Sequence, residues 1–279
     1  MEYGATIFFT DSSISPQELG PALEERGFEC LWVAEHSHIP ACRTTPFPGG
    51  GDLPRMYYEV MDPFVTLPAA AAVTRTLKLG TGIALVPQRD PIQTAKAVAS
   101  LDRVSNGRFL FGVGGGWNVE EARNHGVGNF PRRWKRMRES IEAMKAIWTE
   151  EKAEYHGEFV DFDPVFAWPK PVQQPGPPVH VGGAFPHGAR RAVRYGDGWM
   201  PINPGKALGE EIRGFHQMCR DAGREELPVS LFAAPGKPES LAVVRDAGVA
   251  RAIFMLPPAG REEILPLLDR YAAARDAAG

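Results

Sequence analysis

The stretch Phe109-Leu110-Phe111-Gly112-Val113, followed at once by Gly114-Gly115-Gly116-Trp117, decides the fold of this chain. An unbroken apolar run of this length predicts a strand buried on both faces, as in a parallel sheet. A helical pattern precedes the run at 91–104, and another follows it at 133–149. The run therefore lies between two helices, which is the order of a β/α repeat.

The same unit recurs on both sides of this stretch. Strands are expected at 5–9, 30–34, 77–84, 109–113, 179–181, 199–202, 229–233 and 252–256, and helices at 15–27, 63–74, 91–104, 133–149, 188–195, 208–222, 238–247 and 261–273. Eight units in 279 residues predict an α/β fold, a single (β/α)8 TIM barrel that forms one domain over 1–279. Repeated prolines at 151–177 predict a small hairpin insertion, and residues 35–61 predict a long loop without helix.

Composition excludes several classes of protein. Hydrophobic residues make up 43% of the chain, charged residues 23%, and the net charge is −3, so neither a nucleic-acid-binding face nor a polybasic membrane anchor is expected. The basic run Arg132–Arg136 is expected to pair with Glu120, Glu121 and Glu139. Three scattered cysteines and a start without the pattern of a signal peptide predict a reduced, cytoplasmic protein.

A barrel carries its chemistry where strands end, and a histidine stands at one such position. His36 follows the second strand, where its near-neutral pKa range suits proton transfer, although it could also cap the strand. His36-x-His38 has the spacing of a metal pair, and His180 lies on the fifth strand. The eighth strand ends in Met255-Leu256-Pro257-Pro258, which offers no further ligand, so no metal is expected.

Glycines mark three further strand ends. Gly82 predicts a bulge or the close approach of a ligand, with a packing glycine as the alternative. Gly114-Gly115-Gly116 would let a flat ligand lie on the backbone, with Trp117 stacked on it or walling the pocket. Gly182-Gly183-Ala184, before a helix start, would hold an anion by backbone amides, although an ordinary turn also uses glycine.

Four segments in register carry a resemblance to a known family. They are Leu31-Trp32-Val33-Ala34-Glu35-His36, Leu79-Gly80-Thr81-Gly82-Ile83, Arg108 to Trp117, and Val181-Gly182-Gly183 followed by Gly196-Asp197-Gly198-Trp199. Together they resemble the bacterial-luciferase-like family, most closely its branch of F420-dependent oxidoreductases. The resemblance implies the barrel already predicted and coenzyme F420 as the cofactor, with FMN as the alternative.

The resemblance also implies roles for individual residues. His36 would transfer a proton and contact the cofactor, and Gly82-Ile83 would form a cis peptide under the central ring. The remaining cofactor contacts would come from Gly114, Gly115, Gly116, Trp117, Asn118, Gly182, Gly183 and Ala184. A substrate pocket is expected to include Phe9, Trp32, His38 and Trp117. Sugar-phosphate dehydrogenases of this branch carry an acid where this chain has Trp117, which favours a more apolar substrate.

The expected reaction is hydride transfer between the deazaflavin and a small carbonyl-bearing or conjugated substrate. The first alternative is an FMN-dependent monooxygenase of the same family that takes reduced flavin from a separate reductase. The second, from another class, is a non-catalytic flavin-binding protein, which would need the anion cradle but not His36. The resemblance further implies a homodimer, and the 35–61 loop would serve as an interface or a lid.

Overall fold

The parallel strands close into a ring. In the computed structural model, which describes all of residues 1–279, one sheet has the order β8-β7-β4-β3-β2-β1-β10-β9. Its strands are β1 Glu2–Ile7, β2 Cys30–Val33, β3 Lys78–Thr81, β4 Phe109–Val113, β7 Val179–Gly182, β8 Gly198–Met200, β9 Ser230–Phe232 and β10 Arg251–Met255. Parallel bridges from Trp199 to Val229 and from Ile202 to Phe232 join the two edges. The predicted (β/α)8 barrel is therefore confirmed.

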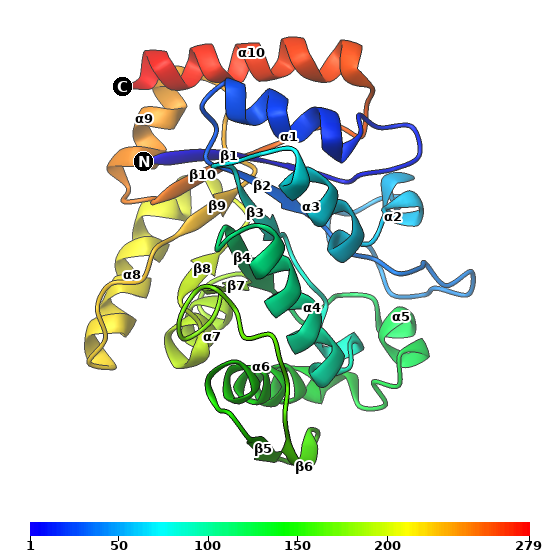
Figure 1. Cartoon of the computed structure of the whole chain (residues 1–279). Helices are drawn as coiled ribbons and strands as arrows, with labels where there is room; N and C mark the ends of the chain where they lie inside the picture. The colour runs from blue at the N-terminus through cyan, green and yellow to red at the C-terminus, as the bar shows by residue number, and fades with distance from the viewer.

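Helices surround this ring (Figure 1). They are α1 Pro16–Glu25, α2 Met56–Glu59, α3 Pro63–Ala72, α4 Pro91–Val104, α5 Val119–Asn124, α6 Arg133–Thr149, α7 His187–Tyr195, α8 Leu208–Asp221, α9 Pro238–Asp246 and α10 Arg261–Ala278. The start of α4 shows why several bounds were predictable: the Asp90 carboxylate accepts from Gln93 N–H at 2.8 Å, and Pro91 occupies the first turn. No helix has both the length and the apolar character that crossing a membrane requires.

The structure confirms the predicted hairpin insertion but not the predicted helix-free loop. An antiparallel hairpin of β5 Ala153–His156 and β6 Asp161–Val165 lies inside the predicted 151–177 insertion, below α6 in Figure 1. The prediction of a helix-free loop at 35–61 was wrong, because α2 forms one helical turn there. That turn is closed by hydrogen bonds of 3.1 Å from Tyr57 N–H to Pro54 and 2.9 Å from Tyr58 N–H to Arg55.

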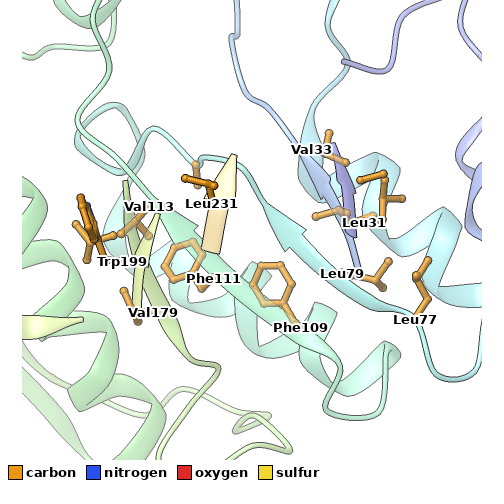
Figure 2. Close-up of a cluster of buried hydrophobic side chains, with 14 of the residues drawn as sticks. Leu31, Val33, Leu77, Leu79, Phe109, Phe111, Val113, Val179, Trp199 and Leu231 are labelled. Carbon is orange, nitrogen blue, oxygen red and sulfur yellow. The ribbon is translucent and has the colours of Figure 1, made fainter. Parts of the chain in front are cut away.

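Strand residues alternate between two cores. Leu31, Val33 and Phe109 belong to the large cluster that the strands share with the helices, part of which Figure 2 shows. Their neighbours Trp32 and Leu110 belong to a separate small cluster with Cys30, Met200 and Ile253. Because successive side chains of a strand point to opposite faces, the first set faces the helices and the second fills the barrel.

Trp32 is the largest side chain of this inner cluster. It is fully buried, and a β-carbon added to Gly80 on the neighbouring strand would lie 2.3 Å from its ring. Position 80 therefore has to be glycine for the indole to fit. His180 packs edge-on against the indole at 5.7 Å, and burial lowers the pKa of His180 to about 3, so this imidazole is neutral. The packed interior closes the barrel below the functional end.

Candidate active site

A cleft of about 380 Å³ lies at the carboxyl ends of the strands. Its walls come from segments that directly follow β1, β2, β3, β4, β7 and β8, with Tyr57 of α2 and Trp134 of α6. The lining residues are Phe8, Ala34, Glu35, His36, Tyr57, Gly82, Ile83, Leu85, Gly114, Gly115, Gly116, Trp117, Trp134, Gly182, Gly183, Ala184 and Ile202. In a parallel barrel these ends share one face, which is where its enzymes carry their chemistry.

The floor of the cleft consists of backbone and two apolar side chains. The peptide bond between Gly82 and Ile83 is cis, as expected. A β-carbon on Gly114 would lie 1.8 Å from Ile83 Cδ1, and one on Gly182 would lie 3.1 Å from Ile83 Cγ2. A β-carbon on Gly115 would lie 2.6 Å from the Trp134 ring. The glycines therefore let Ile83 and Trp134 lie directly on the backbone, and together they form a smooth apolar surface.

One end of the cleft offers a free backbone donor. Gly183 has φ +129°, a conformation that side chains disfavour, and it leads into Ala184 three residues before α7 begins at His187. The Ala184 N–H donates to no other group of the chain, while its carbonyl accepts from Gly188 N–H at 2.7 Å. Unpaired amides before a helix are suited to binding an anion.

A histidine and a glutamate form a buried pair at the side of the cleft. His36 Nδ1 lies 2.8 Å from Glu121 Oε2, with the side chains 6% and 0% exposed. The second oxygen of Glu121 accepts from Ser37 N–H at 3.1 Å. The carboxylate therefore binds both the imidazole, at Nδ1, and the backbone N–H of the following residue. This leaves His36 Nε2 without a protein partner, and so able to exchange a proton with a ligand.

Aromatic rings surround this pair. The His36 ring lies 5.3 Å from Tyr57 and 5.8 Å from Trp117, and Phe47 lies 5.2 Å from Tyr57 and 5.8 Å from Trp117. Phe8 adds a further contact with Tyr57 at 4.9 Å. Phe47 and Tyr57 both come from the 35–61 loop, so this loop covers one side of the cleft with apolar surface.

Glu120 attaches the same loop to α5. Its carboxylate accepts from the Thr44 N–H and hydroxyl at 3.0 and 2.6 Å, and from the Thr45 N–H and hydroxyl at 3.2 and 2.6 Å. These bonds, first those of the Thr44 and Thr45 hydroxyls, lower the pKa of Glu120 to about 2. The carboxylate is therefore charged at neutral pH, and it anchors the loop beside Trp117.

The family follows from the sequence as a whole. The sequence model described as luciferase-like monooxygenase matches residues 16–254. The chain belongs to the luciferase-like monooxygenase family. Among its relatives, the uncharacterized protein Rv0953c of Mycobacterium tuberculosis is 40% identical, and the match covers 98% of both chains.

Two relatives with a named activity are less similar. F420-dependent hydroxymycolic acid dehydrogenase of Mycobacterium tuberculosis is 28% identical over 81% of this chain and 60% of its own length. The oxygenase component of flavin-dependent trigonelline monooxygenase of Acinetobacter baylyi is 30% identical over 80% of this chain and 62% of its own length. Monooxygenase RslO1 from Streptomyces bottropensis has a similar fold, with a TM-score of 0.78 at 22% identity over 98% of both chains. Members of the luciferase-like family thus include oxidoreductases that use different cofactors.

The structure of this family member brings most of the expected site residues together. The cleft is lined by His36, Gly82, Ile83, Gly114, Gly115, Gly116, Trp117, Gly182, Gly183 and Ala184. Four others lie outside its lining: Phe9, Trp32, His38 and Asn118. The metal pair weighed for His36 and His38 does not form, since His38 bonds to Ser37 and Asn124 and no group of three or more potential ligands is present.

The expected placements of these four residues are corrected for physical reasons. Strand β1 ends at Ile7, so Phe8 faces the cleft and Phe9 is fully buried in the outer core. Trp32 is sealed inside the barrel below the cleft. Asn118 is buried at the start of α5, where its side chain accepts from Glu121 N–H at 3.1 Å. Both ring nitrogens of His38 are bonded outside the cleft lining, to Ser37 Oγ and to the Asn124 amide at 2.8 Å each.

Several residues of the site were not predicted. The basic run was expected to pair with Glu120, Glu121 and Glu139. Only the pairing with Glu139 is confirmed, by Lys135 at 3.7 Å, and Arg132 and Lys135 also pair with Glu158. The signal for the short helix was present, because Asn118-x-x-Glu121 is the pattern of a helix N-cap followed by an acid at the third position. No local pattern indicates that Tyr57 or Trp134 would reach the cleft.

Proposed function

We propose that this protein is an F420-dependent oxidoreductase, which transfers a hydride between the deazaflavin and a small carbonyl-bearing or conjugated organic substrate. The observation that carries this proposal is the buried His36–Glu121 pair at the side of an apolar, glycine-floored cleft. The likeness to an F420-dependent dehydrogenase over 81% of the chain supports the choice of cofactor.

The residues present suit such a cofactor. A flat tricyclic ring needs an apolar surface without projecting side chains, and Gly114, Gly182 and Ile83 provide one. A phosphate needs hydrogen-bond donors, and the unpaired Ala184 N–H before α7 is one. Gly82 and Ile83 would contact the ring, Gly114 to Trp117 would line it, and Gly182 to Ala184 would hold the phosphate.

The residues of the chain handle the proton while the bound cofactor supplies a carbon centre that gives or accepts a hydride. Oxidation of an alcohol releases a proton from the hydroxyl oxygen, and reduction of a carbonyl requires one at the same atom. His36 Nε2 accepts or delivers that proton, because Glu121 holds Nδ1 and stabilises the positive charge that forms on the ring. Tyr57 and Trp117 keep water from the reacting atoms.

The alternative with a specific observation behind it is an FMN-dependent monooxygenase. It draws on the 30% identity to the oxygenase component of trigonelline monooxygenase, and it would require reduced flavin from a separate reductase. A non-catalytic flavin-binding protein would use the same cleft without His36. Stopped-flow measurement of hydride transfer, together with binding of each cofactor, separates the three functions.

Replacement of His36 tests the catalytic proposal. His36→Asn should bind the deazaflavin as the unchanged protein does, while kcat falls by about two to four orders of magnitude, the usual contribution of a general acid or base. His216→Asn is the matched control, because His216 lies on α8 and pairs with Glu226 away from the cleft. Unchanged turnover in His36→Asn would remove the proposed role of His36 in proton transfer.

Further properties belong to the same proposal. We expect a homodimer, one domain over residues 1–279, a cytoplasmic location and a 35–61 loop that opens to admit substrate. Hydrogen bonds from Thr44 and Thr45 to Glu120 hold this loop, and breaking them would release it.

A further inference from the structure

A second cavity adjoins the cleft, and its walls are strongly basic. It has a volume of about 320 Å³ and lies between α6 and α7. It is lined by Trp134, Lys135, Arg138, Arg190, Arg191, Arg194 and Tyr195, and no acidic side chain lines it. We call it the α6–α7 cavity. Trp134 lines both cavities, so the basic groups lie next to the cleft at this ring.

The positive charges of the α6–α7 cavity are poorly neutralised. Arg190, Arg191 and Arg194 form no ion pair, and α7 itself contains no acid. On α6, Lys135 pairs with Glu158, and Arg138 lies 3.5 Å from Glu142. Three guanidinium groups on a single helix therefore surround this cavity without a counter-ion, those of Arg190 and Arg194 exposed and that of Arg191 half-buried, and their summed positive charge attracts an anion.

Two of the arginines in this region are held by Trp134 rather than by carboxylates. Arg191 Cζ lies 3.6 Å from the centre of a Trp134 ring, and Arg133 Cζ lies 4.4 Å from it. Burial, followed by the nearby charge of Arg191, lowers the pKa of Arg133 to about 10. Burial also lowers the pKa of Arg191. Each guanidinium is thus partly dehydrated, and an anion in the α6–α7 cavity would stabilise Arg191, which lines it.

An independent observation comes from a tyrosine in the same wall. Tyr195 is 8% exposed, yet its hydroxyl has no hydrogen-bond partner. Burial raises the pKa of the Tyr195 hydroxyl, so the group is protonated and available as a donor. Buried polar groups are nearly always paired, and an unpaired hydroxyl in the wall of a basic cavity indicates a missing acceptor.

We propose that the α6–α7 cavity binds the oligoanionic tail of the ligand whose ring occupies the cleft, a chain of carboxylates that extends beyond the phosphate. This inference rests on the proposed function, since a deazaflavin coenzyme carries a phosphate followed by γ-linked glutamates whereas FMN ends at its phosphate. The tail would leave the donors at Ala184, pass Trp134 and reach Arg190, Arg191 and Arg194. Both ends of this route belong to the loop and helix that follow β7.

The test measures binding, by fluorescence titration, of deazaflavins that carry no tail, two glutamates or five glutamates. Affinity should rise with tail length, and the rise should weaken at high salt. In Arg190→Gln/Arg194→Gln the affinity of the five-glutamate form should fall about two- to fivefold per arginine, as for exposed ion pairs, while tail-less binding stays the same. Arg270→Gln on α10 is the control, an exposed arginine without an ion pair.

Several outcomes separate failure of this inference from failure of the proposed function. Equal affinity for all three deazaflavins in the unchanged protein would overturn the α6–α7 assignment while leaving the cofactor intact. If no deazaflavin binds, the cofactor proposal fails. Calorimetry with free tri-γ-glutamate and with tripolyphosphate then tests the cavity by itself. Binding of tri-γ-glutamate that is lost in Arg190→Gln/Arg194→Gln supports a carboxylate site, and binding of neither compound overturns it. Binding of tripolyphosphate alone would assign the cavity to phosphates and overturn the carboxylate tail.

Discussion

His36 and Glu121 are 85 positions apart in the sequence, yet His36 Nδ1 lies 2.8 Å from Glu121 Oε2 in a position closed to solvent. The strand β2 delivers the histidine, and the first turn of α5 delivers the carboxylate. Glu121 is itself fixed by Asn118, which accepts from its N–H at 3.1 Å, and by Ser37. The imidazole is therefore oriented by three groups of the chain before any ligand binds.

Replacement of Glu121 by Gln keeps the shape of the side chain and removes its charge. Glu121→Gln should lower kcat about 10- to 100-fold and leave the deazaflavin dissociation constant unchanged, because the residue acts through His36. A loss of stability with an unchanged kcat would show that Glu121 serves packing alone.

The close packing of the cleft floor predicts that one methyl group added at Gly114 weakens cofactor binding. In Gly114→Ala the added carbon would lie 1.8 Å from Ile83 Cδ1, so Ile83 must move toward the space above it. We expect about tenfold weaker cofactor binding, from a cost in the range of small-to-large substitutions. Gly128→Ala is the matched control, because nothing lies within 4 Å of its added carbon. Equal affinities in both variants would contradict a ring seated on this floor.

The hydrogen bonds that attach the 35–61 loop to Glu120 predict how readily a protease cuts this loop. Glu120→Ala removes the acceptor of four hydrogen bonds from Thr44 and Thr45. Limited proteolysis should then cut within 35–61 several times faster than in the unchanged protein, while cleavage elsewhere keeps its rate. Glu225→Ala, at an exposed position, supplies the comparison. Identical cleavage rates would mean that the aromatic contacts of Phe47 and Tyr57 hold the loop by themselves.

These effects show which parts of the site the sequence could predict. The bounds of β4, α4 and α6 follow from local signals, such as Asp90 and Pro91 at the start of α4 and the apolar run 109–113. The glycine floor could be predicted because each glycine follows a strand, and all strands of a barrel end at one face. Neither inference depends on knowing which distant segments touch.

The remaining parts depend on tertiary contacts or on register. The first strand was predicted to end at residue 9, but it ends at Ile7. Because successive residues face opposite sides, Phe8 lies in the cleft and Phe9 in the core. The contact between Tyr57 and His36 depends on how a long loop returns across the barrel. Trp134 reaches the cleft because Gly115 leaves room for its ring, and no spacing in the sequence encodes that contact.

Ion pairs at the end of the barrel opposite the cleft predict that the stability of the protein depends on pH. Glu29 accepts from Arg251 Nη2 at 2.6 Å and from Lys78 Nζ at 2.8 Å. Burial alone would raise the pKa of Glu29, but the bonds to Arg251 and Lys78 outweigh it and lower the pKa to about 2 from 4.5. The charged carboxylate therefore stabilises the fold above pH 4.5, and this contribution should be lost as the pH falls from 4.5 toward 2.

Urea unfolding between pH 7 and pH 3 measures this contribution. In Glu29→Gln the free energy of unfolding should fall less steeply with acid than in the unchanged protein. Arg251→Gln should cost about 3 to 5 kcal/mol at pH 7, because it leaves a largely buried carboxylate without its main partner. Arg270→Gln should cost less than about 0.5 kcal/mol. Parallel acid profiles for Glu29→Gln and the unchanged protein would exclude Glu29 as a source of the pH dependence.

Equilibrium titration of the purified protein with oxidised coenzyme F420 and, in parallel, with FMN tests the central claim most directly. The cleft described here should bind the deazaflavin at least tenfold more tightly than FMN, and Gly114→Ala should weaken that binding. Tight binding of FMN without measurable affinity for the deazaflavin would contradict the proposed function.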